Sequence, residues 1–170
     1  SGTTLAASTG SWNTVSSEYS MDYAEENPMT YMASNWYGGS VPGNAWHTSE
    51  SEKGLYDPCP VGYRVPDGGS DGFWATATWL NATKLDSTNS GLHWTLADGE
   101  TTAWYPAVGY RLYSGGTLNY VGRGYYWSAS PYLYNSNSYN AYSLIFDNGS
   151  VYCVNYNGRG YGYSVRCVRE

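Results

Sequence analysis

Residues Tyr125 to Arg169 read YYWSASPYLYNSNSYNAYSLIFDNGSVYCVNYNGRGYGYSVRCVR, and this stretch decides the fold. Short apolar runs alternate there with Asn148-Gly149 and Asn157-Gly158, and Asn-Gly is a strong signal for a two-residue β-hairpin turn. The apolar framework consists of Leu144, Phe146, Val151, Val154, Val165 and Val168. Most residues between these positions are Tyr, Asn, Ser or Gly, which antibody loops also favour, because Tyr gives rigid contact area and small polar residues adapt their hydrogen bonds. The stretch therefore predicts antiparallel strands that carry a recognition surface.

The composition excludes several classes of partner. Net charge is -6, with 8 Lys and Arg in total, so the chain has no basic stripe to neutralise a phosphate backbone. We therefore expect no nucleic-acid partner and no attraction to an anionic membrane surface. No apolar run is long enough to cross a bilayer, which predicts no direct membrane insertion by this fragment. The chain has 20 Tyr and 8 Trp but only 2 Phe, so we expect many aromatic side chains at the boundary with water.

The length of 170 residues suits one domain with its own core. The first residues, SGTTLAASTGS, read as a small polar linker. We expect a lead-in over residues 1–16 and a single domain over residues 17–170, in a chain that is a mature or excised piece of a longer protein.

Local patterns predict helices before strands. Ser17–Ala24 has weak helical character, and Asn27-Pro28 should end it because a residue before proline disfavours the helical conformation. Apolar residues at helical spacing predict a longer helix over Ser70–Leu85, and Gly91–Glu100 reads as a loop. From Trp104 onward, short strands and Gly-rich turns follow. A helical first part followed by an antiparallel meander indicates an α+β fold.

The three cysteines leave two arrangements open. Cys59 and Cys167 are either two buried thiols or one disulfide, whereas Cys153 lies in the Tyr- and Asn-rich stretch. The chain has no C-x-x-C and no H-x-x-x-H spacing, so we expect no metal site with His47 or His93.

Catalysis is not indicated either. A reactive cysteine pair would require Cys153, and Asp67, Asp71 and Asp98 have no matched acid partner for a glycosidase. We expect that the protein is not an enzyme and needs no cofactor.

Four ordered motifs carry a family resemblance. LYDPCPVGYRVP at Leu55–Pro66, WYPAVGYR at Trp104–Arg111, GYYWSAS at Gly124–Ser130 and GYSVRCVRE at Gly162–Glu170 resemble the major paralogous domain of Fibrobacter and of fimbrillin-like surface proteins of Bacteroides. NPMTYMASNWY at Asn27–Tyr37 is similar to the segment that precedes this domain. The resemblance implies an α+β, C-type-lectin-like fold, in which a helical and loop-rich N-terminal part packs on a small twisted antiparallel sheet.

The resemblance also implies a variable region over about residues 123–163. In several such proteins a diversity-generating retroelement mutates template adenines, and mutated Asn codons yield the Tyr, Ser, Asp, Gly, Arg and Cys residues found here. A surface strand that drifted to polar residues is the alternative. The candidate ligand-binding residues are Arg123, Tyr132, Tyr134, Asn135, Asn137, Tyr139, Asn140, Tyr142, Asn148, Cys153, Asn155, Tyr156, Asn157, Arg159, Tyr161 and Tyr163. The calcium-binding Glu-Pro-Asn or Gln-Pro-Asp loop of C-type lectins is absent from the sequence, so no calcium-dependent sugar binding is expected.

Two classes of function follow. The first is a ligand-binding or adhesion module at the cell surface, whose partner is a protein or glycan on another cell or host surface. The second class is a structural subunit of a surface fibre. The receptor-binding tip of a phage tail fibre is a further alternative, in which the same binding module has a different host. We expect Trp104, Trp127 and Phe146 to be buried. We also expect one contiguous, mostly exposed patch, formed by Tyr132, Tyr134, Tyr139, Asn140, Asn155, Tyr156, Asn157, Arg159 and Tyr161. We also expect Cys59, Val61, Tyr63 and Val65 to lie beside the strand that carries Val165 and Cys167.

Overall fold

The computed structural model describes residues 13–15, 21–27, 30–32, 45–49, 52–76, 79–86, 91–96, 99–100, 102–134 and 137–170. Helices in these ranges are α1 (Met21–Glu26) and α2 (Phe73–Thr76). The strands are β1 (Asn13–Val15), β2 (Thr30–Met32), β3 (His47–Ser49), β4 (Glu52–Lys53), β5 (Tyr63–Arg64), β6 (Trp79–Asp86), β7 (Gly91–Leu96), β8 (Thr102–Pro106), β9 (Tyr110–Arg111), β10 (Leu118–Asn119), β11 (Gly124–Tyr134), β12 (Asn137–Phe146), β13 (Val151–Gly158) and β14 (Val168–Arg169).

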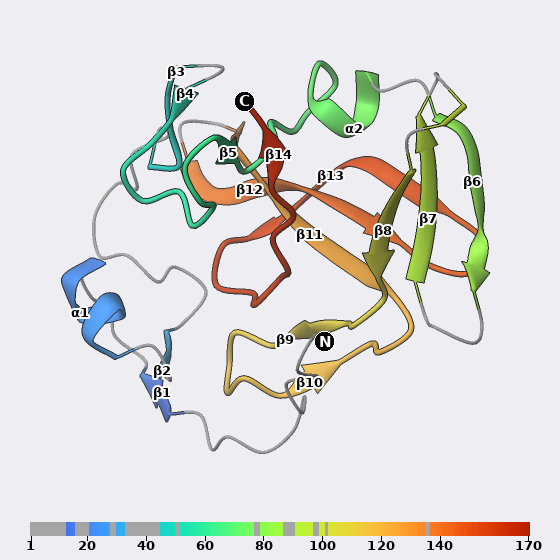
Figure 1. Cartoon of the computed structure of the whole chain (residues 1–170). Helices are drawn as coiled ribbons and strands as arrows, with labels where there is room; N and C mark the ends of the chain where they lie inside the picture. Colours follow the sequence, from blue (N-terminus) through green and yellow to red (C-terminus); the bar gives the residue numbers. More distant parts are fainter. Residues whose placement is uncertain are drawn as a thin grey trace.

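The central element is an antiparallel sheet in the order β11-β12-β13 (Figure 1). The turn at Asp147–Ser150 joins β12 to β13, and the Asp147 Oδ1 atom accepts hydrogen bonds from the backbone N–H groups of Gly149 at 3.0 Å and Ser150 at 3.1 Å. The turn predicted at Asn148-Gly149 is therefore confirmed. Asn157-Gly158 behaves differently, because both residues remain in β13 and pair with β12; the backbone turns only after them.

The outer edge of β11 is covered by the chain segment before the C-terminus. Trp127 N–H donates to Ser164 O at 2.9 Å, and Ser164 N–H donates to Tyr125 O at 3.0 Å. Gly162 exchanges two backbone hydrogen bonds with Arg111 in β9. These bonds hold residues 161–164 against the sheet and leave β13 as the opposite edge strand.

A second antiparallel sheet, β6-β7-β8, lies beside the first, and the main core forms between them (Figure 1). Its buried residues are Trp74, Leu92, Trp94, Tyr105, Ala107, Tyr126, Leu144 and Phe146. Glycine is needed where β11 meets this core, because a Cβ on Gly124 would lie 2.0 Å from the Phe146 ring.

The predicted α+β class is wrong, because the described residues are mainly β. The helix expected over Ser70–Leu85 is reduced to four residues in α2, and β6 occupies Trp79–Asp86. The loop expected at Gly91–Glu100 contains β7, which pairs with β6 and β8. Strand pairing thus overrides a helical spacing of apolar residues. The helical N-terminal part implied by the C-type-lectin resemblance is likewise not found in the described ranges before β3, where α1 has six residues and ends before Asn27 as predicted.

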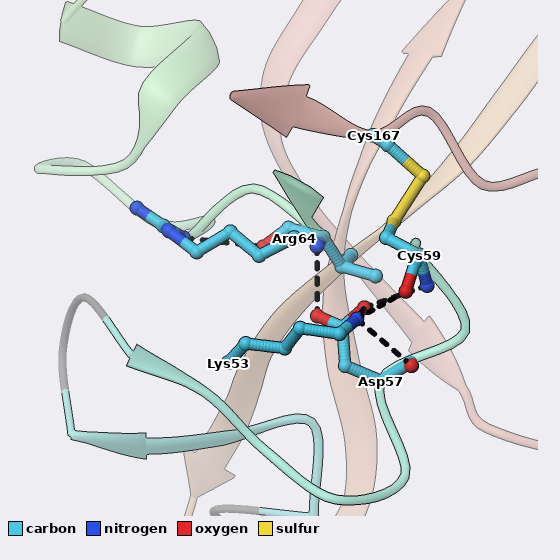
Figure 2. Close-up of a disulfide and its surroundings, with 6 residues drawn as sticks. Lys53, Asp57, Cys59, Arg64 and Cys167 are labelled. Atoms are coloured by element: carbon cyan, nitrogen blue, oxygen red, sulfur yellow. Dashed lines mark hydrogen bonds and ion pairs between the residues drawn. A yellow bond between two sulfur atoms is a disulfide. The ribbon is translucent and has the colours of Figure 1, made fainter. Parts of the chain in front are cut away.

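The loop around Cys59 and the C-terminal strand are joined in what we call the disulfide frame, residues 53–65 and 167–169, shown in Figure 2. A disulfide links Cys59 to Cys167 with Cα atoms 5.8 Å apart, and β5 pairs antiparallel with β14. The expected neighbourhood of these segments is therefore confirmed, and the choice between thiols and disulfide is resolved. Val65 is fully buried, whereas Val61 is 95% exposed.

One buried carboxylate organises the loop around Cys59. Asp57 has no exposed side-chain surface and accepts hydrogen bonds from the backbone N–H groups of Cys59 and Val65, each at 2.8 Å (Figure 2). Lys53 Nζ lies 2.6 Å from Asp57 Oδ1 and also donates to the backbone oxygens of Asp57 and Cys59. The buried charge is thus paired and its oxygens are satisfied, which is the condition for tolerating it.

Candidate ligand-binding surface

Four of the predicted residues meet on one face at one end of the β11-β12-β13 sheet. Tyr132 lies opposite Asn140, and Tyr142 lies opposite Tyr156, so their side chains share a face. The Tyr132 and Tyr156 rings stack with centroids 3.7 Å apart and planes 2° apart, while Tyr142 meets Tyr132 edge-on at 5.3 Å. We call Tyr132, Asn140, Tyr142 and Tyr156 the tyrosine face.

The loop before α2 supports this face. In this loop, Gly68 N–H donates to Ser130 Oγ of β11 at 3.1 Å. Ser128 Oγ, also in β11, donates to Tyr142 O at 2.9 Å. Gly69 has φ of +95°, and a Cβ on Gly68 would lie 2.6 Å from the Cβ atom of Tyr142. The loop therefore approaches Tyr142 as closely as a glycine allows, and this fixes one side of the ring cluster.

The predicted exposure holds for only part of the surface. Tyr156 is 47% exposed, but Tyr132, Asn140 and Tyr142 are half-buried because the rings cover one another. Trp127 and Phe146 are buried as predicted, whereas Trp104 is only half-buried.

Other predicted residues lie on the opposite face of the sheet. Asn155 pairs with Ser143, and Asn157 pairs with Ala141. Each of these residues is the immediate neighbour of Tyr142 or Tyr156 in its strand. The Asn157 amide donates to Asn155 Oδ1 at 3.0 Å. The predicted single patch is therefore divided, because neighbouring strand residues point to opposite faces.

Tyr161 and Tyr163 are part of the framework beside β11. Tyr163 stacks on Trp127 with ring centroids 4.3 Å apart, and Trp127 Nε1 donates to Tyr161 O at 3.2 Å. Both tyrosines also contact the Tyr110 ring. Burial, reinforced by neighbouring tyrosines, raises the pKa of Tyr163 far above its ordinary value.

Arg123 and Asn148 lie at the other end of the sheet. Gly124 pairs with Phe146, and Phe146 lies six residue steps along β12 from Asn140, or about 20 Å of extended chain. The Arg123 guanidinium lies 5.1 Å from the centre of the Tyr120 ring and 4.0 Å from Asp147. A hydrogen bond to Tyr125 is the main cause that raises the pKa of Arg123.

Cys153 faces the core instead of solvent. It packs against the main core cluster, and burial raises the pKa of its thiol. A thiol held in the protonated form is a poor nucleophile.

For four predicted residues the structure gives no side-chain position. Asn135 lies outside the described residues. Tyr134, Asn137 and Tyr139 belong to β11 or β12, with Tyr134 opposite Asn137, and their side-chain positions lie outside the description.

Sequence reasoning missed the aromatic cluster that backs Tyr161. Tyr110 stacks with Tyr120 at 5.8 Å and meets Tyr125 edge-on at 4.8 Å, and Tyr113 meets Tyr161 edge-on at 5.1 Å. The tyrosines of GYRLY at 109–113 were a possible signal, but the pairing of Arg111 with Gly162 is not visible in the sequence.

The described residues contain no group of three His, Cys, Asp or Glu side chains that could hold a metal ion. Neither α1 nor α2, the helices of the described ranges, is long and apolar enough to span a membrane. No protein-family model, curated protein or solved structure matches this chain.

Proposed function

We propose that this domain is a non-catalytic, ligand-binding or adhesion module displayed at the cell surface, and that it binds its ligand through the tyrosine face. The observation that carries the proposal is the stacked pair Tyr132–Tyr156, whose outer ring is half-exposed on a hydrogen-bonded sheet. Exposed aromatic rings held in a fixed orientation bind with little loss of side-chain entropy.

The composition supports a surface that changes between sister proteins. Strand pairing in β12 and β13 uses backbone groups, which are the same for every side chain. Tyr, Asn and Ser can therefore replace one another on the tyrosine face without altering the backbone pairing of the sheet. We propose that a retroelement diversifies residues 123–163, as in the major paralogous domains that the sequence resembles.

A location outside the cytoplasm is supported by the disulfide. Cys59 and Cys167 are bonded across 108 residues, and disulfides persist in oxidising compartments. We propose a cell-surface location on this ground.

The test is a binding screen with matched variants. Four copies of the chain are coupled to one labelled carrier to strengthen weak binding, and this reagent is incubated with arrays of glycans and of extracellular proteins. Tyr156→Ala should weaken the strongest interaction by on the order of 2 kcal/mol, or roughly 30-fold. Tyr152→Ala is the control, because Tyr152 is also on β13 and 50% exposed but lies towards the other end.

The proposal fails if every ligand binds the wild type and Tyr156→Ala equally. Sequencing of the surrounding DNA is an independent check. An adjacent reverse transcriptase and a template copy that differs at adenines would support diversification.

A further inference from the structure

We propose that the tyrosine face and Arg159 together bind a carboxylated sugar, with the sugar ring on Tyr156 and the carboxylate on the Arg159 guanidinium. This assignment rests on the proposed function, because it names the ligand class of the same surface.

Arg159 lies at the same end of the sheet as the tyrosine face. Its Nε donates to the backbone oxygen of Asn140 at 3.3 Å. Asn140 pairs with both Tyr132 and Gly158, the residue before Arg159. Tyr132 in turn stacks on Tyr156, so a continuous series of contacts connects the guanidinium to the exposed ring.

The charge of Arg159 has no partner of opposite sign among the described residues. Arg64 and Arg123 lie 2.9 Å and 4.0 Å from Asp67 and Asp147, but no such ion pair joins Arg159 to a described carboxylate. Arg159 is half-buried, and burial lowers its pKa, so the cation is held in a place that disfavours charge. A bound anion would offset that cost.

The hydrogen-bonding geometry suits a carboxylate. Guanidinium has five N–H donors in a planar fork, and only the Nε donor of Arg159 is bound to an acceptor in the described part of the chain. The two terminal nitrogens are left to engage a carboxylate in the paired manner that arginine favours. Because Nε is already anchored, less side-chain freedom is lost on binding.

The ring supplies the second half of the site. Tyr132 is the one aromatic partner of Tyr156 within the described residues, and the Tyr156 side chain remains 47% exposed. An exposed aromatic face accommodates the C–H face of a pyranose ring, while the Asn140 amide beside it can bond to hydroxyl groups.

One cation beside one ring favours a sugar acid over an acidic peptide. Arg159 is the only Lys or Arg between Arg123 and Arg166 in the sequence. Acidic and phosphorylated peptides are bound by clusters of cations, and the described residues at this end of the sheet include no such cluster. The net charge of -6 also opposes a highly charged polyanion.

The experiment uses the intact chain and paired probes. Methyl glycosides of glucuronic, galacturonic and N-acetylneuraminic acid are titrated by NMR, each beside its carboxyl-reduced form. At least one acid should bind roughly tenfold or more tightly than its reduced form. Arg159→Gln should remove that preference, Arg159→Lys should retain part of it, and Tyr156→Ala should weaken both forms. Arg123→Gln, at the other end of the sheet, is the control and should change nothing.

Thermal melts of each variant exclude loss of folding as the cause. The assignment is overturned if no acid binds at about 10 mM, if acid and reduced forms bind alike, or if Arg159→Gln keeps the preference. It is also overturned if a tetraglutamate peptide binds as tightly as the sugar acids. A different ligand that is lost in Tyr156→Ala but retained in Arg159→Gln would sink this assignment and leave the proposed function standing.

Discussion

The disulfide frame and the tyrosine face use polar side chains in opposite ways. In the frame, the Asp57 carboxylate bonds to backbone N–H groups and to Lys53, so the course of the chain depends on the side chain. On the tyrosine face, the rings contact one another and the strands pair through their backbones. Changes in the frame should therefore alter folding, and changes on the tyrosine face should alter binding.

The largest effect is expected at Asp57. Asp57→Ala leaves Lys53 without its carboxylate partner and two buried N–H groups without an acceptor, so the free energy of unfolding should fall by about 3–5 kcal/mol. Urea unfolding measures the change. Asp67→Ala is the matched control, because the partly exposed Arg64–Asp67 pair should contribute about 0–1 kcal/mol. Equal losses in the two variants would contradict the assigned role of Asp57.

The next effect is expected from the disulfide. The bond closes a loop of 108 residues, so the double variant Cys59→Ala, Cys167→Ala should lose about 2–5 kcal/mol of unfolding free energy through a less constrained unfolded chain. Thermal melts with and without a reducing agent check this expectation. Cys153→Ala should remain as sensitive to reduction as the wild type, because Cys153 is not part of the bond. Insensitivity of the wild type to full reduction would show that the frame does not need the bond.

The sequence predicted features that depend on neighbouring residues. The Asp147–Ser150 turn was found because Asn-Gly and a preceding Asp have direct turn chemistry. Trp127 and Phe146 are buried as predicted, whereas Trp104, expected to be buried with them, is only half-buried. The helix over Ser70–Leu85 failed because β6 pairs with β7, the segment that was expected to be a loop, and the spacing of apolar residues within 70–85 does not reveal that pairing.

The sequence also did not show which residues of β13 join the tyrosine face, because this depends on how the strands are aligned. The register between β12 and β13 shifts between Ser143 and Ile145, and the register between β11 and β12 shifts after Trp127. A shift of one residue moves side chains to the other face, and turn residues alone do not reveal it. Alternation along a strand separates Asn155 from Tyr156, but the register shifts decide which of the two shares a face with Tyr132 and Tyr142.

A smaller effect is expected within the tyrosine face. The stacking of Tyr132 on Tyr156 should give a coupling energy of about 0.5–1.5 kcal/mol in a double-mutant cycle with alanine, measured by urea unfolding. The pair Tyr132 and Tyr152 is the control and should show additive effects, since no ring contact joins them in the described structure. A single Tyr156→Ala loss as large as that of Asp57→Ala would remove the distinction between frame and face.

The smallest effect is expected from Tyr163, a residue of the predicted variable region that belongs to the framework beside β11. Tyr163→Phe keeps the ring that stacks on Trp127, so stability at neutral pH should change by no more than about 0.5 kcal/mol. Burial raises the pKa of Tyr163 above the ordinary value of 10.0, so the unfolded chain loses this proton first as pH rises. The wild type should therefore be fully stabilised below pH 10 and lose stability above it.

Tyr163→Phe cannot lose that proton, so at pH 11 it should retain up to about 1 kcal/mol more of its neutral-pH stability than the wild type does. Urea unfolding at pH 8 and pH 11 measures this difference. Tyr152→Phe is the matched control, because the Tyr152 side chain is 50% exposed. Among the described ring contacts, none joins Tyr152 to the framework beside β11. If both variants follow the wild type at alkaline pH, Tyr163 is not held in a buried position, and it returns to the candidate ligand-binding surface.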